Sequence, residues 1–194
     1  MPAGSFIERS KPDHKMKYLA DWIRHLSQES FQAYSRLQEL LKDGVLEGFL
    51  NLNLEKTTPT SRRLMFNFSF PENGTDKSFS ISFGQLSDGQ RMLVALYTIV
   101  CALEEQDYII CIDEPENFIS LREIQPWLRM IEDLVHEKGR QCLMISHHPE
   151  MLNYLANEYG TLLYREESGV VRSKKFECDK ELLRPAEIMA RGWE

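Results

Sequence analysis

The segment LSDGQR (86–91) places a hydroxyl and a glycine where a helix is expected to begin. Backbone N–H groups and the helix dipole at such a start attract an anion. Ser87 also fits an ordinary N-cap, in which its hydroxyl satisfies the first turn of the helix. Taken alone, the segment favours the ordinary cap, and the anion site stays open as the functional alternative.

Two adjacent carboxylates, Asp113 and Glu114, directly follow the apolar run 108–112. In open parallel sheets, ligand sites form outside the carboxyl ends of the strands. We expect Asp113 to approach a magnesium ion, directly or through water, and Glu114 to face a water molecule as general base. A solvated acidic turn is the alternative interpretation of this pair.

A second apolar run, 142–145, ends in the residues SHHPE (146–150). His147 at that place can donate a hydrogen bond to a phosphate oxygen. Neighbouring strands would bring it to the sheet edge where Asp113 and Glu114 lie. His148 suggests a metal ligand, but no other pair of His or Cys has ligand spacing, so zinc is disfavoured.

The elements around these segments alternate between helix and strand. Helices are predicted at 89–104, 121–138 and 149–157, strands at 108–112 and 142–145, and a hairpin at 161–165 and 170–175. The two strand runs show no polar alternation, so both faces are expected to be buried, with Ile110 and Leu143 in the core. Such alternation predicts an α/β fold with a mainly parallel sheet and flanking helices.

A different pattern precedes these elements. Apolar residues recur at helical spacing over 18–26 and 31–41, and short strand-like runs follow at 49–54, 64–70 and 79–83. We therefore predict three segments: a helical hairpin at 1–48, an antiparallel β meander at 49–83, and an α/β lobe at 84–194.

Composition narrows the function classes. The 194 residues, 42% hydrophobic and 27% charged, are typical of a globular domain, and no apolar run reaches the length of a membrane span. We expect a cytoplasmic protein without membrane association. The net charge of −7 gives no electrostatic argument for DNA binding. Four cysteines without a CxxC pair do not suggest a disulfide or zinc framework.

In their order, LSDGQR, IICIDEPEN and MISHHPE resemble the C-terminal half of ABC-type ATPases. The resemblance is to the RecF-like and structural-maintenance-of-chromosomes (SMC) branch of P-loop NTPases. Within that branch it is to the bacterial AAA-family ATPases that include the ATPase part of OLD-family nucleases. It covers residues 83–165, and the preceding hairpin and meander look like the segment that often stands before the signature motif.

The resemblance implies ATP and Mg²⁺ as cofactors. Ser87 and Gly89 match the signature positions that hold the γ-phosphate of ATP bound to the opposite protomer, with Gln90 beside them. Asp88 stands where a second glycine is more usual.

The other motifs carry over in the same way. Asp113 matches the Walker B aspartate and Glu114 the catalytic glutamate. Glu116 and Asn117 fall where the D-loop begins, and His147 matches the switch histidine.

One part of the family pattern is missing from the sequence. A P-loop requires GxxxxGK[ST], and no glycine here is followed by lysine. The chain is then a fragment or split gene product whose other half carries the P-loop, or it has lost nucleotide chemistry. The retained Glu114 and His147 favour the first interpretation, in which a homodimer or a P-loop-bearing partner chain completes the site.

Two classes of function follow from these patterns. The first is part of an ATP-hydrolysing ATPase that sandwiches ATP between protomers in DNA repair or in defence against phage and foreign DNA. In that case the isolated chain is expected to be inactive. The second is a catalytically inert module that docks a partner protein such as a nuclease. Nucleotide-dependent dimerisation separates the two, because only the first requires it.

Overall fold

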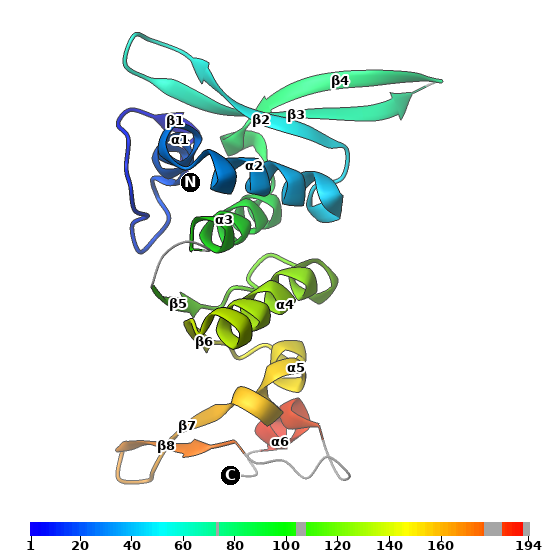
Figure 1. Cartoon of the computed structure of the whole chain (residues 1–194). Coiled ribbons are helices and arrows are strands. Elements are labelled where there is room, and N and C mark those ends of the chain that lie inside the picture. Colours follow the sequence, from blue (N-terminus) through cyan, green and yellow to red (C-terminus); the bar gives the residue numbers. More distant parts are fainter. Residues whose placement is uncertain (73, 104–107, 177–183, 192–194) are drawn as a thin grey trace. The chain divides into compact units, whose positions relative to one another are not determined.

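The computed structural model describes residues 1–72, 74–103, 108–176 and 184–191 (Figure 1). The helices are α1 (Leu19–Glu29), α2 (Phe31–Leu40), α3 (Asp88–Leu103), α4 (Leu121–Lys138), α5 (Pro149–Tyr159) and α6 (Pro185–Arg191). The strands are β1 (Gly4–Ser5), β2 (Phe49–Lys56), β3 (Arg62–Glu72), β4 (Thr75–Ser82), β5 (Ile109–Asp113), β6 (Gln141–Ile145), β7 (Thr161–Arg165) and β8 (Val171–Lys175).

The chain divides into two compact units. The first, called here the amino-terminal unit, contains Met1–Ile109 and Asn117–Cys142. The second, the carboxy-terminal unit, contains Ile110–Glu116 and Leu143–Glu194. The boundary therefore runs through β5 and β6.

The predicted antiparallel meander is present in the amino-terminal unit. Strand β3 pairs with both β2 and β4, and the short β1 adds to β3 as well. The alternate residues Leu64, Phe66 and Phe68 of β3 are buried. Asn67, on the other face of β3, hydrogen-bonds across the sheet to Asn51 at 2.7 Å. The two-residue period thus separates an apolar core face from a polar face.

Helices complete the core of the same unit. Helix α2 packs against α1 and α3, and α3 packs against α4. The indole N–H of Trp127 donates to the carbonyl oxygen of Leu96 at 2.9 Å, which joins α4 to α3 inside the core. Helix α4 begins with a capping box between Ser120 and Glu123.

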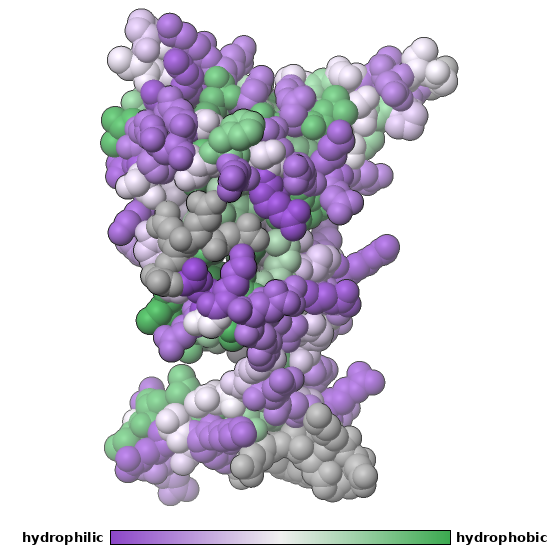
Figure 2. All heavy atoms as spheres, in the orientation of Figure 1, coloured by the Kyte–Doolittle hydropathy of each residue, from purple (hydrophilic) through white to green (hydrophobic). Residues whose placement is uncertain are grey.

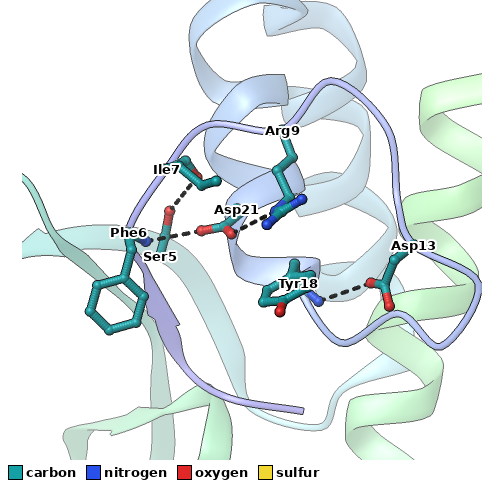
Figure 3. A network of polar contacts seen from close by, with 7 residues as sticks. All are labelled: Ser5, Phe6, Ile7, Arg9, Asp13, Tyr18 and Asp21. Carbon is teal, nitrogen blue, oxygen red and sulfur yellow. Dashed lines mark hydrogen bonds and ion pairs between the residues drawn. The ribbon is translucent and has the colours of Figure 1, made fainter.

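A polar network fastens the N-terminal segment to α1 (Figure 3). Asp21 is buried, and its Oδ1 accepts the backbone N–H of Phe6 at 3.0 Å. Its Oδ2 lies 3.3 Å from Nε of Arg9. The partners explain how a charged side chain is tolerated inside the unit.

The predicted order of helices and strands from α3 to α5 agrees with the structure, and the 121–138 helix has the predicted bounds. The predicted last residue of the preceding helix, Glu104, lies outside the described residues. No helix within the described ranges is long and apolar enough to cross a membrane.

The prediction of a mainly parallel sheet is not confirmed. The pairings with a defined register, β1–β3, β2–β3, β3–β4 and β7–β8, are all antiparallel. Strands β5 and β6 form a separate two-stranded sheet. Among the described residues no third strand joins them, so the central sheet that the alternating helices and strands predicted does not extend further.

The prediction that both faces of these two strands are buried is wrong. Ile110 is buried, but Leu143 and Ile145 on β6 are 60% and 55% exposed. Every second residue of each strand is exposed, which places the exposed side chains on one face. Figure 2 shows apolar surface over this part of the chain. An apolar run reports which side chains avoid water, whereas burial also requires a covering layer.

Candidate functional site

The end of β5 carries the two predicted acidic residues. Asp113 is the last residue of the strand and is exposed. Glu114 follows with a φ of 48°, in the left-handed region that few residues other than glycine adopt. Its backbone N–H donates to the carbonyl oxygen of Ile145 at 2.8 Å, so the turn after β5 is joined to the end of β6. Backbone strain of this kind is concentrated at functional sites.

Glu114 and His147 are in contact. Oε1 of Glu114 lies 2.6 Å from Nδ1 of His147, and the histidine side chain is 80% exposed. The strand ends therefore bring together the carboxylate predicted as general base and the imidazole predicted to bind a phosphate. Their catalytic roles stay predictions.

Glu116, unlike Glu114 and His147, is buried. It is only 6% exposed, and its Oε1 accepts a hydrogen bond from the hydroxyl of Ser146. The sequence interpretation did not single out Ser146, although a hydroxyl residue between the apolar run and His147 was a usable signal. Asn117, the second residue of the predicted D-loop start, is exposed and belongs to the amino-terminal unit.

His148 caps the next helix. Its Nδ1 accepts the backbone N–H of Glu150 at 3.3 Å, and Pro149 occupies the first turn of α5. Within the described ranges, no three His, Cys, Asp or Glu side chains are grouped so that they could hold a metal ion.

The start of α3 forms the second group of predicted site residues. The backbone N–H of Gln90 donates to Oγ of Ser87 at 3.2 Å, and the N–H of Ser87 donates to Oε1 of Gln90 at 3.0 Å. This reciprocal pair is a capping box, so the ordinary N-cap interpretation of Ser87 is correct at the level of local structure. Ser87 is exposed, and its hydroxyl proton can still be donated to an approaching phosphate.

Gly89 is required by close packing against the loop before α4. A Cβ atom at this position would lie 2.5 Å from the carbonyl oxygen of Phe118. Phe118 itself has a φ of 69°. The glycine of the signature segment thus has a structural reason in this chain, beside the predicted phosphate contact.

The two groups of predicted residues belong to different units. Ser87, Gly89 and Gln90 lie in the amino-terminal unit, whereas Asp113, Glu114, Glu116 and His147 lie in the carboxy-terminal unit. The capped helix start lies in one unit and the two joined strand ends lie in the other, whereas Asn117, next to Glu116 in the sequence, belongs to the amino-terminal unit.

The fold is similar to that of SMC ATPase heads. An SmcHead bound to the C-winged helix domain of ScpA matches with a TM-score of 0.54 at 14% identity, over 86% of this chain and 48% of that one. The Smc head domain with a coiled coil from Pyrococcus yayanosii gives 0.53 at 16%, over 93% and 32%. A structure from work on ATP-driven dimerization and DNA-stimulated activation of SMC ATPases gives 0.51 at 15%, over 89% and 98%. The chain thus spans less than half of the first two structures.

The family is shown by sequence. A family model described as "AAA domain, putative AbiEii toxin, Type IV TA system" matches residues 3–153. The chain belongs to this AAA domain family. A comparison with curated protein sequences gave no significant match.

Proposed function

We propose that the chain supplies the signature helix and the hydrolytic residues of an ATP-binding, ATP-hydrolysing ABC-type ATPase. The P-loop would come from another polypeptide segment, since the sequence contains no GxxxxGK[ST]. The observation that carries the proposal is the contact of 2.6 Å between Glu114 and His147 at the ends of β5 and β6.

The position of this pair suits hydrolysis of a phosphoanhydride. Glu114 is half-buried and His147 is exposed, so a phosphate can reach the imidazole while the carboxylate stays beside it. In our proposal Glu114 accepts a proton from the attacking water, and His147 donates a hydrogen bond to the γ-phosphate. The nucleotide would compete with Glu114 for the imidazole and so leave the carboxylate to the water.

A magnesium ion fits this site only if phosphates and water supply most of its ligands. Asp113 offers one exposed carboxylate at the end of β5. Mg²⁺ commonly binds one or two carboxylates, with phosphates and water completing its octahedron. In our proposal Asp113 supplies the protein ligand of this chain, and the metal, when bound, offsets negative charge on the phosphates.

The start of α3 would act on a nucleotide bound to the opposite protomer. Ser87 would donate its hydroxyl proton to the γ-phosphate, and Gly89 and Gln90 would approach the same phosphate group. Asn117 is exposed, which suits a residue of a protomer interface. Glu116 is too buried for that role in this structure.

The partner in this proposal is a second copy of the chain together with the segment that bears the P-loop. A role in DNA repair or in defence against foreign DNA is part of the same proposal. The name of the matched family, which refers to a toxin of a toxin–antitoxin system, supports the defence alternative. A nuclease or DNA would be a further partner of the assembled enzyme.

The test joins the chain to its P-loop segment, sought in the neighbouring reading frame, and measures phosphate release and particle mass with ATP. Glu114→Gln keeps size and hydrogen bonding but removes the base, so hydrolysis should fall about 100-fold or more while an ATP-bound dimer persists. Ser87→Arg should prevent ATP-dependent dimerisation by filling the phosphate position. Normal hydrolysis by Glu114→Gln would contradict the proposal, and Glu150→Gln serves as the control for a nearby exposed carboxylate.

The second candidate function is a docking module without catalysis. The exposed apolar side chains of Leu143 and Ile145 favour it, because a contiguous apolar surface marks a protein contact. This module would bind its partner equally well with and without ATP, and neither Glu114→Gln nor Ser87→Arg would change the binding.

A further inference from the structure

Glu116 is an unusual residue for the turn in which it lies. Asp113 and Asn117 at the ends of this turn are exposed, whereas Glu116 is only 6% exposed and the adjacent Pro115 is also buried. Burying a carboxylate is costly unless its oxygens gain partners. Oε1 accepts the hydroxyl of Ser146, and within the described residues Oε2 is buried and receives no hydrogen bond. The burial of Glu116 therefore rests on its contact with Ser146.

Ser146 in turn holds the backbone next to His147. Its Oγ accepts the backbone N–H of His148 at 3.1 Å. On the preceding side, the carbonyl oxygen of Ile145 accepts the N–H of Glu114. Hydrogen bonds thus fix the backbone at Ile145 and at His148, on either side of His147. We call these two bonds the bracket, and the hydroxyl of Ser146 links Glu116 to it.

His147 depends on that bracket for its direction. A side chain that is 80% exposed is not oriented by packing. Its ring contacts Glu114, which lies on the same turn as Glu116, two residues away. Two contacts therefore join the two turns: Glu114 contacts His147, and Glu116 contacts Ser146. The bond between Glu116 and Ser146 can set the position in which the His147 ring contacts Glu114.

We infer that Glu116 is a positioning residue: through the hydroxyl of Ser146, its buried carboxylate holds the turn that presents His147 to Glu114. The inference deepens the proposed function, since the residues it positions are the general base and the phosphate ligand of that proposal. It concerns a contact already present in the chain alone, so it can be tested without ATP or a partner.

The experiment is ¹⁵N and ¹H NMR of the His147 ring in the full chain, with Glu114→Ala defining the signals of a ring that has lost its carboxylate. Ser146→Ala and Glu116→Ala should each move the His147 signals toward that reference. Ser146→Ala should also speed hydrogen exchange of the His148 amide roughly five- to tenfold, because it removes the hydroxyl oxygen that accepts this N–H. Glu150→Gln, a change at a nearby exposed carboxylate, should leave the signals in place.

Conservative variants separate positioning from general stability. Glu116→Gln keeps an oxygen that can accept the Ser146 hydroxyl but buries an amide NH₂, so Tm should fall by roughly 4–8 °C while the His147 signals stay native. Ser146→Thr should also keep the native signals. If Glu116→Ala does not fold, Glu116→Leu takes its place, because it removes the acceptor of the Ser146 hydroxyl, nearly keeps the side-chain volume and leaves the bond between Ser146 and the His148 N–H available.

A double variant gives the sharpest result. If both residues act through one bond, Ser146→Ala combined with Glu116→Ala should displace the His147 signals no further than the larger single change. Additive displacements would overturn the inference, as would native His147 signals in a folded Ser146→Ala chain. Either of these two outcomes would leave the ATPase proposal intact. Failure of Glu114→Gln to slow hydrolysis would contradict the ATPase proposal but would leave the positioning result intact. In the assembled ATPase, Ser146→Ala should lower kcat more than it changes KM for ATP.

Discussion

The meander of the amino-terminal unit buries one apolar face of its sheet, whereas the β5–β6 sheet leaves an apolar face exposed. In the meander, β3 turns Leu64 and Phe66 into a buried core. In the β5–β6 sheet, Ile110 is buried but Leu143 and Ile145 stay exposed. The difference teaches that β5 and β6 have the composition of central strands but, within the described residues, the surroundings of an unfinished sheet.

The largest effect is expected at the covered face of β5. Ile110→Asp places a charge without a partner in a buried position, which costs several kcal/mol against a total stability of about 5–15 kcal/mol. The chain should unfold or aggregate, as measured by circular dichroism and size-exclusion chromatography. A soluble Ile110→Asp chain with a cooperative melt would show that this face is not part of the core.

A smaller loss is expected where the amino-terminal unit closes its own end. Asp21→Ala removes the acceptor of the Phe6 N–H and the partner of Arg9. A hydrogen bond to a charged group contributes about 1.5–3 kcal/mol, so urea unfolding should occur at lower denaturant concentration. Asp133→Ala, an exposed change on α4, is the control. Equal stability of both variants would mean that the network does not fasten the N-terminal segment.

The stability of the amino-terminal unit should also depend on pH in alkaline solution, because Tyr97 is buried in its interior. Burial, aided by the nearby Cys101 thiol, raises the pKa of Tyr97 from 10.0 to about 12. As pH rises, the Tyr97 phenol therefore loses its proton in the unfolded chain before it does so in the folded chain. The stability associated with the neutral phenol is therefore complete below about pH 10 and is lost as pH rises toward 12.

Tyr97→Phe isolates this contribution. Relative to that variant, the unmodified chain should lose about 1.4 kcal/mol of stability for each pH unit in the window between the two pKa values. Urea unfolding at about pH 9 and about pH 11 measures the difference. An identical pH response of Tyr97→Phe and of the unmodified chain would mean that Tyr97 is accessible to water.

Local patterns predicted much of the fold and part of the site. The spacing of apolar residues gave the order of helices and strands, because periodicity depends on the chain itself. The contact between Glu114 and His147 agrees with the rule that ligand sites gather at strand ends. Burial of Leu143 was wrong, because an apolar run does not show whether a covering layer is present. The Glu116–Ser146 bond was not foreseen either, since it depends on side-chain directions within two turns.

The smallest effect on stability is expected at the open face, where it tests the comparison most directly. Leu143→Asp is chemically the same kind of change as Ile110→Asp, but the side chain is 60% exposed, so the charge remains in water. The free energy of unfolding of the isolated chain should shift by no more than about 0.5 kcal/mol, the usual range for a surface substitution.

In the assembled protein, by contrast, the same change should weaken association if the P-loop segment covers this face, because the charge would then be buried without a partner. Denaturation of the chain alone and co-purification with the P-loop segment measure the two quantities, with Lys175→Ala on the exposed β8 as a neutral surface control. A strongly destabilised Leu143→Asp chain would show that this face is covered within the chain itself, and unchanged co-purification would place the P-loop segment elsewhere.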